Sequence, residues 1–137
     1  MLFPAAGKSR RTCAGAAAVE LAVLLPFLTF MLVAGMDFAR VFYYSLTIMN
    51  CAREGGIYAS LDASHAADSA GIQNAALADA SGITPSPAVT SVTSTDGAGN
   101  PIVTVTVTYS FQTITSYPGI PSPVSLVRTV QMRVLPP

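Results

Sequence analysis

The longest apolar stretch of the chain lies near its N-terminus. Residues 14–36 read AGAAAVELAVLLPFLTFMLVAGM, in which the polar side chains are those of Glu20 and Thr29. A helix needs about 20 residues to cross roughly 30 Å of hydrocarbon. This stretch therefore predicts a membrane-spanning helix.

The helical pattern continues beyond the apolar stretch. Three- and four-residue spacing places apolar side chains on one predicted face, namely Phe38, Val41, Phe42, Met49 and Ala52. The opposite predicted face carries Arg40, Thr47, Cys51, Glu54 and Tyr58. Such spacing is typical of an amphipathic helix. We expect one helix over residues 16–59, roughly 65 Å long, with its second half forming a stalk.

A second, shorter helix is predicted over residues 65–80, which are rich in alanine. Its N-cap would be either Asp62 or Ser64, since both side chains can accept a hydrogen bond from the first turn. Gly82, with Pro85 shortly after it, would end the helix.

The periodicity changes to two in the C-terminal part, which indicates strands. In PIVTVTVTYSF, residues 101–111, one predicted face consists of Val103, Val105, Val107, Tyr109 and Phe111. Residues 88–93 precede this strand across the glycine-rich loop 96–100. A third strand is expected within residues 124–134, with one side formed by Leu126, Val130, Met132 and Val134. These segments predict a three-stranded antiparallel meander.

So small a sheet needs a helix against its apolar face. The stalk supplies that helix, and we expect the apolar side chains of residues 101–111 to pack on Phe38, Phe42 and Met49. At least one sheet edge would stay open for another subunit. The chain is thus predicted to be α+β, with a basic leader over residues 1–15, a transmembrane helix and stalk over 16–60, and an α+β domain over 61–137.

Charge gives the predicted helix a direction across the membrane. Lys8, Arg10 and Arg11 precede the apolar stretch, whereas Arg40 beyond it is offset by Asp37. The positive-inside rule places the N-terminus in the cytoplasm and the remainder outside. Charged residues form 10% of the chain, against about 25% in ordinary soluble domains, which favours a membrane or a partner. The net charge is zero, and outside the N-terminus the few Lys and Arg are scattered, so nucleic acid is not expected as a ligand.

Two other interpretations of the apolar stretch are open. A secretory signal peptide would be cut near Val33-Ala34-Gly35, but its apolar region usually spans ~7 to 15 residues, and this one is longer. Ser9-Arg10-Arg11 resembles a twin-arginine export signal but lacks the apolar residues expected soon after it.

The residue types needed for catalysis or metal binding are scarce. Cys13 and Cys51 lie on either side of the apolar stretch, so they cannot meet if it crosses a bilayer. His65 is the single histidine, and it has no matching nucleophile or carboxylate pattern. Neither a phosphate-binding loop nor a dinucleotide fingerprint is present. We therefore expect no enzymatic activity and no cofactor.

The junction between the basic leader and the apolar stretch carries a processing motif, Gly15-Ala16-Ala17-Ala18-Val19-Glu20. A prepilin peptidase cuts on the cytoplasmic side after a glycine, which would leave Ala16 as the new N-terminus and Glu20 as the fifth residue. A carboxylate one turn from a free amine can pair with its own N-terminus or with that of a neighbour. Glu20 could instead simply extend toward the headgroups.

The N-terminal third of the chain resembles the TadE-like proteins, pseudopilins of tight-adherence (Flp-type) pilus systems. The matching landmarks are Gly15, Glu20, Pro26, Asp37-Phe38-Ala39-Arg40, Ala52-Arg53-Glu54-Gly55 and Tyr58-Ala59. Leu21 departs from the pattern, since an aromatic residue is frequent there, and a basic residue is frequent where Gly56 or Ile57 stands. The resemblance implies a prepilin-peptidase substrate in the bacterial inner membrane, with a periplasmic domain and pilin-like partners.

Three charged residues are candidate partner-binding positions: Glu20, Arg40 and Arg53. Arg53 could alternatively pair with a carboxylate of the β-domain, and Glu54 is expected to be solvated. Tyr43, Tyr44 and Tyr58 are expected to support packing or the interfacial aromatic belt. The alternative function is a membrane-anchored or secreted adhesion domain without catalysis. A mature chain starting at Met1 or near Met36, rather than at Ala16, would favour that alternative.

Overall fold

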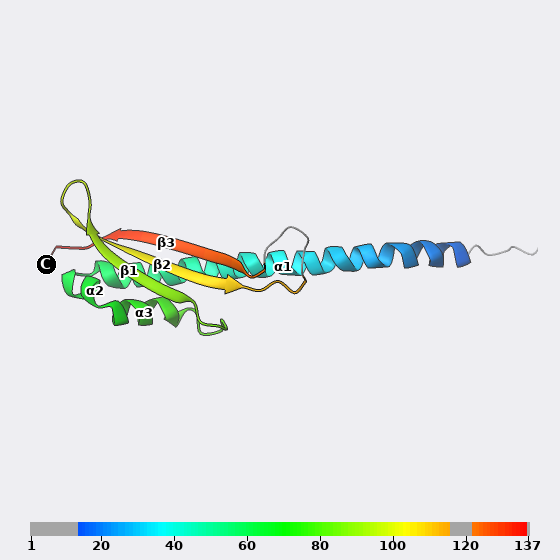
Figure 1. Cartoon of the computed structure of the whole chain (residues 1–137), viewed down its shortest axis with the longest axis horizontal. Coiled ribbons are helices and arrows are strands. Elements are labelled where there is room, and N and C mark those ends of the chain that lie inside the picture. The colour runs from blue at the N-terminus through cyan, green and yellow to red at the C-terminus, as the bar shows by residue number, and fades with distance from the viewer. Residues whose placement is uncertain (1–13, 116–121, 137) are drawn as a thin grey trace, which may run out of the picture.

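The computed structural model describes residues 14–115 and 122–136 (Figure 1). Its elements are α1 (Ala14–Ser60), α2 (Ala63–Ala67), α3 (Ser69–Ala78), β1 (Ala88–Thr95), β2 (Pro101–Phe111) and β3 (Val124–Arg133). The N-terminal half of α1 projects as a rod from the α+β end of the molecule. The predicted α+β class is confirmed, whereas the leader with Lys8, Arg10, Arg11 and Cys13 lies outside the described residues.

The sheet is the predicted antiparallel meander, with strand order β1-β2-β3. Val105 of β2 lies opposite Ser91 of β1 and Val130 of β3, and the register runs without a break along both pairs. Alternate residues of β2 are buried, as predicted, and they form the centre of the core: Val103, Val105, Val107, Tyr109 and Phe111. Strict apolar and polar alternation therefore places one face of β2 against the helices.

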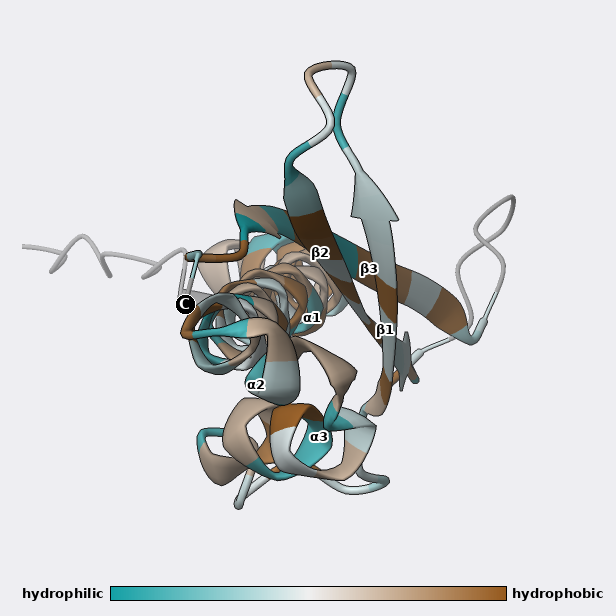
Figure 2. Cartoon of the chain, turned by 90° about the vertical axis from the view of Figure 1, so that its left-hand side faces the viewer, coloured by the Kyte–Doolittle hydropathy of each residue, from teal (hydrophilic) through white to brown (hydrophobic). Residues whose placement is uncertain are grey.

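The helices cover one face of the sheet (Figure 2). The C-terminal half of α1 packs on β2 and β3, and α3 packs on α1 and beneath β1. The opposite face of the sheet carries mostly hydroxyl side chains, including the row formed by Thr90, Thr106 and Thr129. Thr106 and Thr129 are hydrogen-bonded through their hydroxyl groups at 3.0 Å.

The predicted packing face of α1 is wrong for its large side chains, although Val41 and Ala52 of that face do pack against the core. Phe38, Phe42 and Met49 are exposed, at 72%, 67% and 43%, although they were expected to contact β2. The buried face instead consists of Ile48, Cys51, Ala52, Gly55, Gly56 and Ala59. Most of these residues are small, which lets the sheet and α3 approach the helix backbone closely. A Cβ added at Gly55 would lie 3.1 Å from Cβ of Ala76 and 3.3 Å from Val105.

The predicted second helix is two helices, separated at Asp68. Asp62 caps α2 by accepting hydrogen bonds from the N–H groups of Ser64 and His65, whereas Ser64 is not the cap. Asp68 then caps α3 by accepting from the N–H of Gly71 at 2.9 Å. Because Asp68 has a non-helical backbone conformation, the alanine-rich pattern does not continue through it.

Tyr58 supports packing, as expected, although its spacing placed it opposite the predicted apolar face; it is partly buried against the core. Its hydroxyl donates to Asp68 at 2.9 Å, and its ring lies edge-on to His65 with centroids 4.9 Å apart. The side chain thus ties the end of α1 to the start of α3.

Candidate functional site

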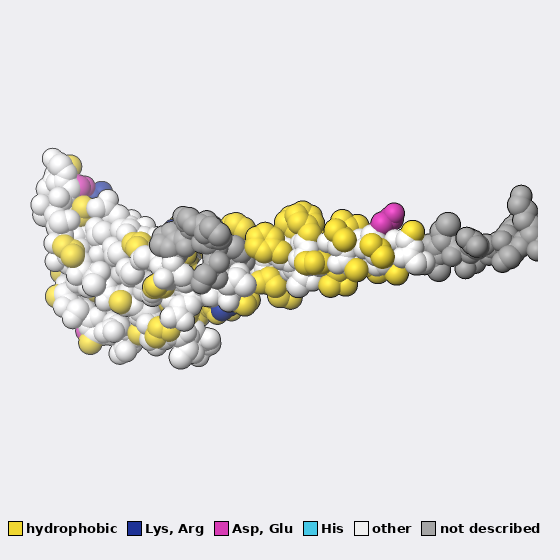
Figure 3. All heavy atoms as spheres, turned by 45° about the vertical axis from the view of Figure 1, so that its right-hand side comes forward, with side chains coloured by type: hydrophobic (Ala, Val, Ile, Leu, Met, Phe, Trp, Pro, Cys, Tyr) yellow, Lys and Arg dark blue, Asp and Glu magenta, His cyan; other side chains and the backbone are white. Residues whose placement is uncertain are grey.

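The first part of the candidate site is the exposed N-terminal half of α1. This helix is long and apolar enough to cross a membrane, and residues 15–32 are exposed throughout. Apolar side chains cover most of the visible face of this part of the rod (Figure 3). Exposure of so many large apolar side chains is the property expected of a surface in contact with lipid.

The three predicted processing residues lie in the first two turns of α1. Gly15 has open space around it, since a Cβ added there would meet no atom within 4 Å. Ala16 and Glu20 are exposed as well. The immediate neighbours of Glu20 are the exposed apolar side chains of Val19 and Leu21. Glu20 is the single charged residue between residues 14 and 36, so its carboxylate is an isolated charge on an apolar surface.

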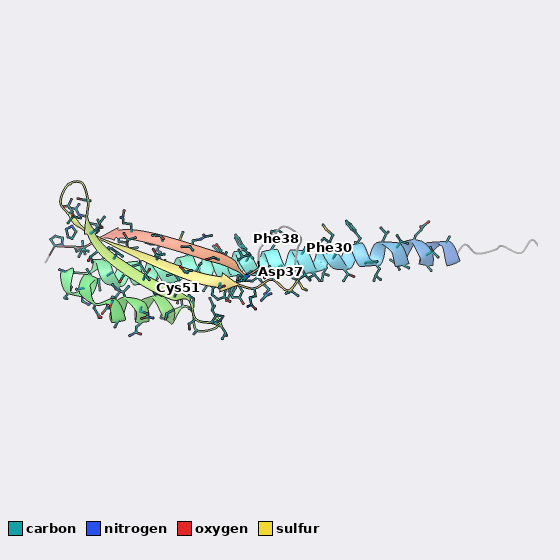
Figure 4. The ribbon with its side chains drawn as sticks, in the orientation of Figure 1. Phe30, Asp37, Phe38 and Cys51 are labelled. Carbon is teal, nitrogen blue, oxygen red and sulfur yellow. The ribbon has the colours of Figure 1, made fainter. Side chains whose placement is uncertain are left out.

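The second part of the site lies where α1 meets the end of the sheet (Figure 4). Asp37 is 3% exposed, and its two carboxylate oxygens accept from the backbone N–H of Ile114 at 3.0 and 3.1 Å. Arg40 donates to Asp37 at 3.4 Å, and its guanidinium lies 5.1 Å from the ring centroid of Phe111. Asp37 therefore connects α1 to the segment after β2, next to the apolar stretch that is long enough to span a membrane.

An open apolar groove lies beside Asp37. It is lined by Phe30, Ala34, Phe38 and Val41 of α1 and by Thr113 and Val124 at the near end of the sheet. Figure 4 shows Phe30 and Phe38 along the same stretch of α1 as Asp37. The groove is thus continuous with the exposed apolar part of the helix.

The predicted partner-binding arginines have different environments. Arg40 makes contacts within the chain, although 42% of its side chain is still exposed. Arg53 is exposed, and among the described residues the ion pair between ordinary charged side chains is Arg40–Asp37, while His65 forms a hydrogen bond with Asp62. The alternative pairing of Arg53 with a β-domain carboxylate is therefore wrong. Glu54 is exposed, as expected.

An aromatic cluster holds α1 against β2. The ring of Tyr44 lies 5.1 Å from that of Tyr109 and 5.7 Å from that of Phe111, between centroids. Burial raises the pKa of Tyr109, whose hydroxyl donates to the carbonyl of Thr84 at 3.3 Å. Tyr44 supports packing, as predicted, whereas the neighbouring Tyr43 is 63% exposed.

One feature was not predicted from the sequence. On the part of α1 that packs on the sheet with one side, another side carries an exposed apolar stripe. We call it the outer stripe; it consists of Phe38, Phe42, Leu46 and Met49. These residues recur at three- and four-residue spacing, so they share one side of the helix. The sequence did contain a signal for the closely packed face of α1. That face is marked by small residues, namely Ala52, Gly55, Gly56 and Ala59.

Within the part of the chain that the structure describes, no group of three or more His, Cys, Asp or Glu residues is placed to hold a metal ion. Cys51 is buried and free of a disulfide. Burial, followed by the charge of Asp79, raises the pKa of the Cys51 thiol. A thiol in such surroundings is a packing residue rather than a nucleophile.

Comparison with known proteins agrees with the resemblance noted in the sequence. The profile of the TadE-like protein family matches residues 15–56. No curated protein and no solved structure matches the chain. The matched segment begins at Gly15 and includes Glu20, Asp37, Arg40 and the outer stripe. Residues 15–56 are therefore similar to the TadE-like family, and together with the apolar helix α1 they fit a membrane protein associated with tight-adherence (Tad) pili.

Proposed function

We propose that this chain is a pilin-like (pseudopilin) subunit that a prepilin peptidase processes after Gly15 and that acts in tight-adherence pilus assembly or secretion. It is a single-pass protein of the bacterial inner membrane, with its N-terminus in the cytoplasm and its α+β part in the periplasm. The basic residues Lys8, Arg10 and Arg11 support this orientation. In this role the chain is a substrate and an assembly component rather than a catalyst.

Cleavage would hydrolyse the peptide bond between Gly15 and Ala16. Water supplies the hydroxyl group of the new carboxyl terminus on Gly15 and the proton of the new amine on Ala16. Both residues lie at the exposed start of α1, where no other part of the described chain covers the bond. The amine and the carboxylate of Glu20 then lie about one helical turn apart.

The outer stripe is the observation that most strongly supports a role in assembly. At ~1.5 Å per residue, Met49 lies roughly 20 Å beyond the end of the apolar stretch at Met36. The headgroup region adds only about 5 to 8 Å to each side of the hydrocarbon. Leu46 and Met49, exposed at 52% and 43%, would therefore face water in an isolated subunit. The outer stripe continues from the apolar half of α1. The partner expected to pack on it is therefore a helix of another membrane-anchored subunit.

The test of this function uses Glu20→Gln in cells that express the whole pilus system. Membrane insertion should be spared, since removing a charge makes insertion easier. Cleavage should also be spared, and the loss should be in co-purification with other pilus components and in piliation. Glu54→Gln is the matched control, because it makes the same change at an exposed position beyond the membrane. Normal co-purification and normal piliation with Glu20→Gln would count against the proposed role.

A further inference from the structure

The two edges of the sheet are protected to different degrees. Val134 donates its N–H to the carbonyl of Pro101, so even-numbered residues of β3 face β2 and odd-numbered ones face outward. On this outward edge, Arg128 donates to the carbonyl of Val127 at 2.8 Å and also to the hydroxyl of Ser45 on α1. The edge of β3 is thus occupied in its middle by a charged side chain, a common way of preventing strand addition.

The edge of β1 has no such protection. Asp96 donates its N–H to the carbonyl of Asn100, so even-numbered residues of β1 face β2. The outward N–H and C=O groups belong to Val89, Ser91, Thr93 and Thr95, and no described residue forms a hydrogen bond with them. Residues 88–95 contain neither a charge nor a proline. An unprotected edge of this kind favours the addition of another strand.

The membrane anchor restricts which strand can be added by a second copy. The end of β2, at Phe111, lies against Arg40 at the membrane end of the domain, so β2 runs toward the membrane and β1 runs away from it. In two copies anchored in the same membrane, both β1 strands run away from the membrane and lie at nearly the same distance from it. Antiparallel pairing of the two β1 strands would direct one anchor away from the membrane. The accessible arrangement is parallel.

The side chains of β1 are compatible with pairing between two identical strands. Parallel pairing of two identical strands places similar residues side by side, and like charges in such positions are destabilising. AVTSVTST brings only Ala, Val, Ser and Thr together. The same arrangement of β3 would bring Arg128 and Arg133 near their counterparts. Confinement of both copies to one membrane also raises their effective concentration.

We propose that the open edge of β1 is a self-association surface, at which two copies of this chain in the same membrane join their sheets through parallel β1 strands. In a parallel pair, a residue that faces the partner lies opposite one that faces away. The two β1 strands are therefore offset by one residue, about 3 Å. This pairing goes beyond the proposed function, since it needs the anchor but not cleavage at Gly15.

The one-residue offset between the two β1 strands can be tested by cysteine crosslinking of the full-length chain. Two differently tagged copies are expressed in membranes without a prepilin peptidase, each with Cys13→Ser and with the buried Cys51 retained. Thr93→Cys in one copy and Ser94→Cys in the other should form a disulfide, because an odd and an even position share one sheet face. Thr93→Cys in both copies should give little product, since those side chains lie on opposite faces. Thr129→Cys with Val130→Cys is the matched control on β3 and should also give little.

A second variant tests the backbone directly. Ser91→Pro removes an outward N–H from the edge while leaving the groups that face β2. The thermal unfolding midpoint should be retained, and the Thr93→Cys with Ser94→Cys product should fall to the level of the Thr93→Cys pair. Absence of the odd–even product in membranes, an equally strong product from the Thr93→Cys pair, or crosslinks only to other proteins would each overturn the proposal.

Discussion

Asp37 and Ile114 are 77 positions apart, yet both carboxylate oxygens of Asp37 accept the backbone N–H of Ile114, at 3.0 and 3.1 Å. The carboxylate is almost fully buried, and Arg40 is its partly exposed cationic neighbour. This contact holds the segment after β2 against α1, just beyond the apolar stretch that is long enough to span a membrane.

Asp37→Asn is expected to lower the free energy of unfolding by about 1 to 3 kcal/mol, because a buried charged acceptor is replaced by an amide with one acceptor oxygen. Arg40→Met keeps an apolar stem over Phe111 and removes a long, partly exposed ion pair together with the cation above the ring. It should cost no more than about 1 kcal/mol. Chemical denaturation of the detergent-solubilised protein provides the comparison. An Arg40→Met cost equal to that of Asp37→Asn would contradict this account of the junction.

The adjacent glycines of α1 are expected to respond differently to alanine. Alanine is favoured over glycine by up to about 1 kcal/mol inside a helix. At Gly56 the new Cβ would meet the flexible side chain of Met132 at 3.2 to 3.4 Å, so Gly56→Ala should be neutral or stabilising. At Gly55 it would meet Ala76 and Val105, which cannot move without shifting α3 or β2. Gly55→Ala should be destabilising by about 1 to 3 kcal/mol, as measured by thermal unfolding. Equal stability of the two variants would show that α3 packs less tightly than described.

Acid should weaken the caps of α2 and α3. The hydroxyl of Ser64 and then the N–H of His65 hold the pKa of Asp62 well below its ordinary value, and the N–H of Gly71 lowers the pKa of Asp68. A lowered carboxyl pKa contributes stability that is present above the unfolded value of about 3.9 and is lost as the pH falls through the folded value.

The measurement for the caps is thermal unfolding between pH 7 and pH 2. Asparagine can cap a helix without a charge. The Asp62→Asn, Asp68→Asn double variant should therefore lose less stability on acidification below about pH 4 than the parent chain does. An identical pH profile for both proteins would exclude these two carboxylates as the source of acid sensitivity.

Much of the fold was predictable from the sequence, because apolar residues recur in it with regular periods. Strict alternation in residues 101–111 identified β2 and its buried face, and the uninterrupted helical pattern identified α1 to within two residues at each end. The packing face of α1 was not predictable from hydrophobicity alone. Large apolar side chains such as Phe42 dominate a prediction made from hydrophobicity, whereas the close contact is made by Ala52 and Gly55, whose small size matters more than their hydrophobicity.

Other features depend on contacts that no local pattern records. The break at Asp68 depends on a cap to Gly71 and on the hydroxyl of Tyr58, ten residues earlier. The role of Asp37 depends on Ile114, and the asymmetry of the sheet edges depends on Arg128 reaching Ser45. Gly15 and Glu20 could be proposed as processing residues from the sequence because their motif lies in one continuous segment at the start of α1.

The mature N-terminus is the most direct test of the proposed processing. Mass spectrometry of the chain from cells with a prepilin peptidase should show Ala16 as the first residue. Gly15→Val should leave the precursor uncut, and Gly35→Val, where an added Cβ also meets no atom within 4 Å, should be cut normally. A first residue of Met1 or one near Met36 in the parent chain, or unchanged cleavage in Gly15→Val, would contradict the account.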